Sequence, residues 1–79
     1  MTKTIYSREY KSFLRLLRET RQQAGMSQQD LANKLGQTQS FVSKCERGER
    51  RIDVVELRHF CRAMKIPVST FIKRLEDSK

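Results

Sequence analysis

The chain has 79 residues, which is enough for one compact domain and too few for two. Hydrophobic residues make up 37% and charged residues 33%, which is enough apolar material for a single core and too much for a chain that stays disordered. The 17 Lys and Arg outnumber the 9 Asp and Glu, so the formal net charge is +8. This surplus favours nucleic acid as a partner, although an anionic membrane surface would also suit it. We expect one domain over 1–79, with its core over about 7–76.

Several other classes of protein are disfavoured by what the sequence lacks. It has no apolar run of about 18 residues and no apolar signal-peptide stretch near its start, so we expect a cytoplasmic protein that does not enter a membrane. Cys45 and Cys61 are far apart, form no CxxC pair and accompany a single histidine, which predicts buried thiols and no metal site or disulfide framework. His59 has no second ligand or nucleophile nearby, and no catalytic constellation or phosphate-binding glycine loop appears. We therefore expect no enzyme activity and no cofactor.

Apolar spacing predicts an all-α chain of five helices. The first runs from Ser7 until Gly25 stops it, with apolar residues mostly three or four positions apart on one face: Tyr10, Phe13, Leu14, Leu17 and Ala24. Ser27 provides an N-cap oxygen and Asp30 places a carboxylate in the first turn, so a second helix of about two turns should follow and end at Gly36.

A third helix is predicted over Gln39–Arg47, after a tight turn, with Thr38 as its N-cap and Gly48 as its end. Each residue of an α-helix rotates by roughly 100°. One side of this helix therefore carries Phe41, Val42, Cys45 and Glu46, and the other carries Ser40, Ser43, Lys44 and Arg47. Gln39 lies between the two sides, in the first turn.

Asp53 and Glu56 form a capping-box pattern before a fourth helix, in which apolar residues recur at helical spacing: Val54, Leu57, Cys61 and Met64. Pro67 prevents that helix from continuing. Ser69 is then expected to cap a last turn or two that carries Phe71, Ile72 and Leu75.

Three segments carry a family resemblance: SQQDLANKLG over 27–36, QSFVSK over 39–44 and ERGER over 46–50. Together they closely resemble the helix-turn-helix of phage-repressor and Cro-type regulators, the XRE family, and the likeness extends from about Leu14 to Leu75. The stretch IPVSTF over 66–71 further resembles the C-terminal turn of restriction-modification controller proteins. The family often has Asn-Pro where this chain has Arg51-Ile52, and a glycine where it has Lys65. Lys65 must therefore adopt a left-handed backbone, or the helix must end differently.

The resemblance implies a compact, lambda-repressor-like DNA-binding domain whose third helix enters the major groove. Gln39 would then pair with adenine and Lys44 with guanine, with Ser40 and Ser43 as secondary readers. In an arbitrary helix such a polar face is usually just solvated, and the surrounding motif is what favours base reading here. We expect Phe41 to pack beneath the second helix rather than against a sugar or a thymine methyl.

Contacts to the DNA backbone are predicted around both helices. Gln28 resembles the family glutamine that binds a phosphate and braces the first reading residue. Arg47, Arg50 and Arg51 form a basic cluster around Gly48 that could bind the flanking phosphates, although runs of charge are often only solvated. We predict phosphate contacts from these three residues and from Thr38. The cations of the first helix, Arg8, Lys11, Arg15 and Arg18, are expected to solvate its outer face.

Arg21 and Glu46 match a family pair that joins the first helix to the end of the reading helix as a partly buried ion pair. One helix gives few base contacts, so we expect a homodimeric repressor on a short palindromic operator, with half-sites about 34–36 Å apart. The predicted dimer surface is Phe71, Ile72 and Leu75. No small-molecule effector is expected. Two alternatives remain open: a controller-type activator, and an antitoxin-like protein-interaction module, although the chain lacks the disordered extension such modules usually use.

Overall fold

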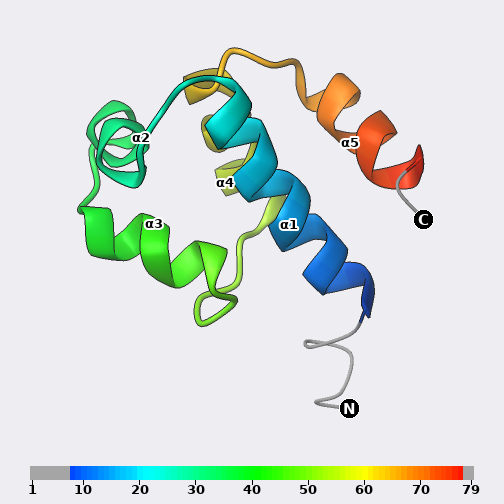
Figure 1. Cartoon of the computed structure of the whole chain (residues 1–79), viewed down its shortest axis with the longest axis horizontal. Helices are drawn as coiled ribbons and strands as arrows, with labels where there is room; N and C mark the ends of the chain where they lie inside the picture. The colour runs from blue at the N-terminus through cyan, green and yellow to red at the C-terminus, as the bar shows by residue number, and fades with distance from the viewer. Residues whose placement is uncertain (1–7, 78–79) are drawn as a thin grey trace.

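The computed structural model describes residues 8–77 and forms five α-helices there, without β-strands (Figure 1). They are α1 (Arg8–Gln23), α2 (Gln28–Leu35), α3 (Gln39–Glu46), α4 (Val54–Ala63) and α5 (Val68–Asp77). The all-α, five-helix prediction is therefore confirmed. Helix α1 contacts both α3 and α5, while α4 contacts α2 and α5 and closes the bundle (Figure 1). The predicted helix start at Ser7 lies outside the described residues.

Side-chain caps begin the three central helices, as predicted. Ser27 Oγ accepts a hydrogen bond from Asp30 N at 3.0 Å, and Asp30 Oδ2 accepts one from Ser27 N at 3.0 Å. Asp53 and Glu56 form the same reciprocal box at α4, with distances of 2.8 and 3.1 Å. The Thr38 hydroxyl caps α3 by accepting from the third helical N–H at 3.1 Å. Local polar side chains thus fix where α2, α3 and α4 start.

Two left-handed residues end α2 and α4. Gly36 has φ 69°, and its N–H bonds back to the last turn of α2. Lys65 has φ 61° and is the only non-glycine residue with positive φ between residues 8 and 77. The N–H of Lys65 donates to the Arg62 carbonyl at 3.1 Å, and the N–H of Ile66 donates to the Cys61 carbonyl at 3.0 Å. Helix α4 therefore ends in a left-handed turn of the kind that glycine usually occupies, at the expense of a strained lysine backbone.

Three details of the predicted elements are wrong. Helix α5 starts at Val68 and is 10 residues long, because Pro67 presets the helical φ and its carbonyl accepts from Phe71 N at 3.1 Å; Ser69 is inside the helix rather than its cap. Val54 is 68% exposed, since burial along α4 begins only at Leu57. Ala24 is exposed in the turn after α1 and does not extend its apolar face.

The core draws on all five helices and includes Phe13, Leu17, Leu31, Val42, Phe60 and Phe71. Phe71 is fully buried and meets the Phe13 ring edge-on at a centroid distance of 5.9 Å. Cys45 and Cys61 are free thiols with no exposed surface, as predicted, and burial raises the pKa of both. Within residues 8–77, no helix is long and apolar enough to cross a bilayer.

Candidate nucleic-acid interface

Helix α3 separates its two sides as the sequence predicts. Val42, Cys45 and Glu46 are buried, and Phe41 is half-buried. The opposite side faces solvent: Gln39, Ser40, Lys44 and Arg47 are exposed and Ser43 is half-buried. The outward side of α3 is therefore a polar surface, which we call the reading face; it consists of Gln39, Ser40, Ser43, Lys44 and Arg47.

An ion pair inside the domain anchors the end of α3 to α1. Arg21 Nε donates to Glu46 Oε2 at 2.6 Å, and its second terminal nitrogen donates to Oε1 at 3.1 Å. The side chain of Glu46 has no exposed surface and that of Arg21 is 10% exposed. Arg21 also donates to the Met26 carbonyl at 2.8 Å, which ties the pair to the start of α2. The geometry is bidentate, so it fixes the angle of α3 as well as its position.

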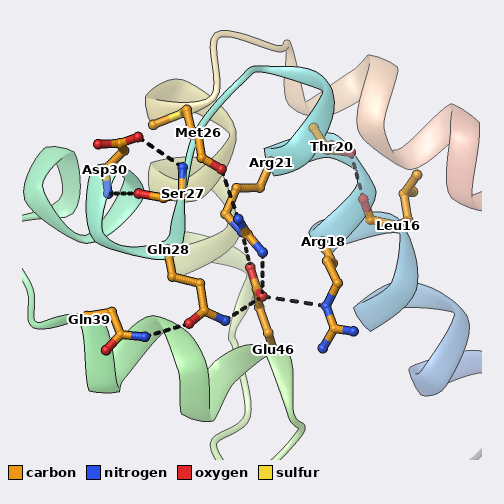
Figure 2. A network of polar contacts seen from close by, with 10 residues as sticks. All are labelled: Leu16, Arg18, Thr20, Arg21, Met26, Ser27, Gln28, Asp30, Gln39 and Glu46. Atoms are coloured by element: carbon orange, nitrogen blue, oxygen red, sulfur yellow. Dashed lines mark hydrogen bonds and ion pairs between the residues drawn. The ribbon is translucent and has the colours of Figure 1, made fainter.

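A hydrogen-bond relay leads from this pair to the reading face (Figure 2). Gln28 Nε2 donates to Glu46 Oε1 at 2.9 Å, and Gln39 Nε2 donates to Gln28 Oε1 at 2.6 Å. A carboxylate can only accept hydrogen bonds, so Gln28 must turn its nitrogen towards Glu46 and its oxygen towards Gln39. Gln39 must in turn donate. The buried charge thus determines which atoms of an exposed side chain remain available.

The cations after α3 have partners within the chain. Arg47 makes a two-bond ion pair with Glu49, at 2.9 and 3.1 Å, and also donates to Ser43 Oγ. The Arg47 hydrogen bond lowers the pKa of Glu49, and the pairing raises the pKa of Arg47. Both side chains are about half exposed, so water screens the pair and it contributes little to stability.

Arg50 and Arg51 fix the loop between α3 and α4. Arg50 pairs with Glu56 at 2.8 Å and lies 4.9 Å above the centre of the Phe41 ring. Arg51 lies 5.5 Å from the ring centre of Tyr10 on α1. Phe41 packs against the core, and its ring centre lies 6.3 Å from that of Phe60 on α4.

Among the contacts of this region that sequence reasoning missed are those of Arg18 and Glu56. Arg18, assigned to the outer face of α1, places Nε 3.7 Å from Glu46 Oε1 (Figure 2). The three-residue spacing from Arg18 to Arg21 could have indicated this, because such residues are neighbours on a helix. Glu56 both completes the capping box of α4 and pairs with Arg50, a double role that the local pattern cannot show.

Two short helices joined by a three-residue turn, with a polar outward side on the second, define a helix-turn-helix DNA-binding domain. The family model of a helix-turn-helix domain matches residues 12–70. An XRE-family-like protein from Pseudomonas syringae pv. tomato str. DC3000 has 46% sequence identity and a TM-score of 0.86, over 96% of this chain and 93% of that one. The chain therefore belongs to the XRE family of helix-turn-helix transcription regulators.

More distant solved structures share the fold. The wild-type restriction-modification controller protein C.Esp1396I has a TM-score of 0.82 at 22% identity, over 90% of this chain and 92% of that one. The same controller, solved as a tetramer in complex with its natural 35 base-pair operator, has a TM-score of 0.81 at 22% identity, over 90% and 93%. No curated protein matches the chain.

Proposed function

We propose that the protein recognises a short two-fold-symmetric operator in double-stranded DNA by placing α3 in the major groove, and that it acts in the cytoplasm as a homodimeric repressor. The observation that carries the proposal is the relay that ends at Gln39 on the reading face. Because the relay starts at a buried carboxylate, Gln39 is oriented before DNA arrives. Binding then loses less side-chain entropy.

The remaining atoms of Gln39 match adenine. One N–H of its amide is used on Gln28, and no other described residue bonds its second N–H or its Oε1. Adenine presents an N6–H donor and an N7 acceptor in the major groove, which is the complementary pattern. A bidentate pair of this kind contributes about 1–3 kcal/mol of discrimination against a wrong base. We therefore assign the principal base contact to Gln39.

Three further side chains of the reading face complete the proposed base contacts. Lys44 is exposed and forms no ion pair within residues 8–77, so its ammonium is available for guanine O6 and N7. Ser43 Oγ accepts from Arg47, which leaves its hydroxyl hydrogen for a base acceptor. Ser40 is exposed and is proposed as a secondary reader.

Backbone contacts are proposed at the helix starts and in the following loop. The N–H of Gln28, in the first turn of α2, has no intrahelical partner and suits a phosphate oxygen. The Thr38 hydroxyl accepts from α3 and keeps its hydrogen for a phosphate. Arg51 meets only an aromatic ring among the described side chains, so its N–H groups remain available. Arg47 and Arg50 are already paired with carboxylates, so we assign them weaker contacts than Arg51.

A homodimer follows from the small number of base contacts that one α3 can make. Two copies related by two-fold symmetry would read half-sites about 34–36 Å apart. On α5, Ile72 is 39% exposed and Leu75 is half-buried, and we propose these residues as part of the dimer surface. The prediction that Phe71 belongs to this surface is wrong, because Phe71 is fully buried in the core of its own chain. The tetramer of the controller protein on its operator supports assembly of this fold on DNA.

The test is selection of binding sites from randomised duplexes, followed by sedimentation of the protein with and without a selected site. We expect an enriched two-fold-symmetric sequence and a complex containing two copies of the chain. A promoter that carries the selected site should lose reporter output when the protein is expressed, with no added small molecule. Recovery of no enriched sequence would overturn the proposed function. A strict monomer on DNA would overturn the proposed homodimer. Increased reporter output would overturn the proposed repression and show that the protein is an activator.

A further inference from the structure

Three cations recur along one side of α1 at helical spacing: Lys11, Arg15 and Arg18, which we call the α1 stripe. All three are exposed, and the opposite side of the helix is occupied by core residues such as Phe13 and Leu17. Like charges three or four residues apart on a helix repel by a few tenths of a kcal/mol for each pair. The stripe therefore does not serve the stability of the free helix.

A chain of polar contacts links the α1 stripe to the reading face. Arg18 Nε lies 3.7 Å from Glu46 Oε1, the same oxygen that accepts from Gln28. Figure 2 shows Gln39, Gln28, Glu46 and Arg18 in one row, which passes from α3 across the start of α2 to α1. The side chain of Arg18 is 51% exposed, so much of its guanidinium faces solvent beside this row.

The stripe also borders a hollow between α1 and the end of α3. Its volume is about 400 Å³, and its lining includes Lys11, Arg15, Arg18, Glu19 and Glu46. The Glu46 carboxylate is already bonded by Arg21 and Gln28, so Glu19 is the one other acidic group that faces the hollow. Neither Lys11 nor Arg15 forms an ion pair within the described residues. The hollow is thus lined by positive charge in excess.

We propose that the α1 stripe binds the phosphate backbone of the DNA that flanks the bases read by α3. The inference rests on the proposed function, and it adds a third element to the two helices that form the helix-turn-helix. From residue 11 to residue 18 the helix advances roughly 10 Å at about 1.5 Å per residue. Phosphates of one strand follow one another at about 3.4 Å along the duplex axis, so a stripe of this length can reach more than one phosphate. Its cations position the protein and read no sequence.

The test compares two double variants that each remove two positive charges. Lys11→Gln/Arg15→Gln removes two members of the stripe and leaves Arg18, which touches the ion pair, unchanged. Arg62→Gln/Arg74→Gln is the control, because both are exposed cations outside α1, α2 and α3 that form no ion pair in the described part of the chain. Affinity for a selected duplex and a random duplex is measured by fluorescence anisotropy over a series of salt concentrations. Thermal unfolding checks that each variant is folded.

Affinity falls as salt rises, and each phosphate contact adds about 0.9 to the steepness of log affinity against log salt. At 0.1 M salt one contact therefore increases affinity by up to about eightfold relative to 1 M salt. We expect the salt dependence of the Lys11→Gln/Arg15→Gln variant to be shallower by nearly two, with equal losses of affinity for the selected and the random duplex. The Arg62→Gln/Arg74→Gln control should change the slope by much less. A stripe variant whose slope equals that of the control overturns the inference while the proposed function stands. A wild-type protein without preference for the selected duplex overturns the proposed function itself, and the inference with it.

Discussion

Neutralising Glu46 tests the ion pair that holds α3. In Glu46→Gln the side chain keeps its shape, but the Arg21 guanidinium keeps its charge with only 10% of its side chain exposed. Removing one partner of a buried pair costs about 3–5 kcal/mol, because the other charge stays buried. A chain of 79 residues has a free energy of unfolding of only about 4–12 kcal/mol. The variant should therefore lose a large part of its stability.

The assay is thermal and urea unfolding followed by circular dichroism. For a domain of this size each kcal/mol shifts Tm by about 4–8 °C, so we expect Tm to fall by at least about 12 °C. A loss below about 1 kcal/mol would refute the reasoning, since it would mean that water screens the pair as it does on a surface.

A double replacement separates stability from DNA recognition. Arg21→Met combined with Glu46→Leu removes both charges, and such apolar replacements are often neutral or stabilising. We expect unfolding close to that of the wild type. Gln28, however, loses the acceptor that orients its amide, so preference for the base read by Gln39 should weaken. Full retention of that preference in a stable double variant would refute the role of the relay.

Three further predictions concern the scaffold. Lys65→Gly should raise the free energy of unfolding by about 0.5–1 kcal/mol in urea titrations, because it relieves a positive φ; no gain would mean that the turn is unstrained. Cys45 and Cys61 should react with a disulfide reagent only in proportion to the unfolded fraction, and fast reaction of the native protein would contradict their burial. The Arg50 hydrogen bond holds the pKa of Glu56 below its usual range, so its stabilisation is present above about pH 4.3 and is lost as pH falls through the folded pKa. Tm should thus fall less on acidification in Glu56→Gln than in the wild type, and parallel curves would exclude this contribution.

Local signals predicted the element starts well. Ser27, Thr38 and Asp53 act through residues three positions away, so the sequence alone contains both partners of each cap. The polar side of α3 also follows from helical rotation, which separates Ser40, Ser43 and Lys44 from the buried residues and leaves Gln39 between the two sides. The start of the last helix is harder to predict, because two nearby residues both favour a helix start. Ser69 was a reasonable cap by composition, but Pro67 starts the helix earlier.

The sequence does not show which partners the side chains of the site have in space. Ile72 and Phe71 are adjacent apolar residues, and only the packing of α5 against α1 decides that Phe71 is buried. Arg47 and Arg50 are long, flexible side chains, and each has a carboxylate within reach, at Glu49 and at Glu56. Composition indicates a basic cluster there, but it does not indicate how many of its hydrogen bonds are already made inside the protein.

The most direct test of base reading is a thermodynamic cycle between Gln39 and the base that it is assigned to read. Affinities of the wild type and of Gln39→Ala are measured for the selected operator, with the preferred adenine either present or replaced. If the pair is bidentate, each single change costs about 1–3 kcal/mol, or roughly 5- to 150-fold, and the second change adds little. Losses that simply add, or an alanine variant that keeps the adenine preference, would contradict the assignment of α3 as the helix that reads DNA.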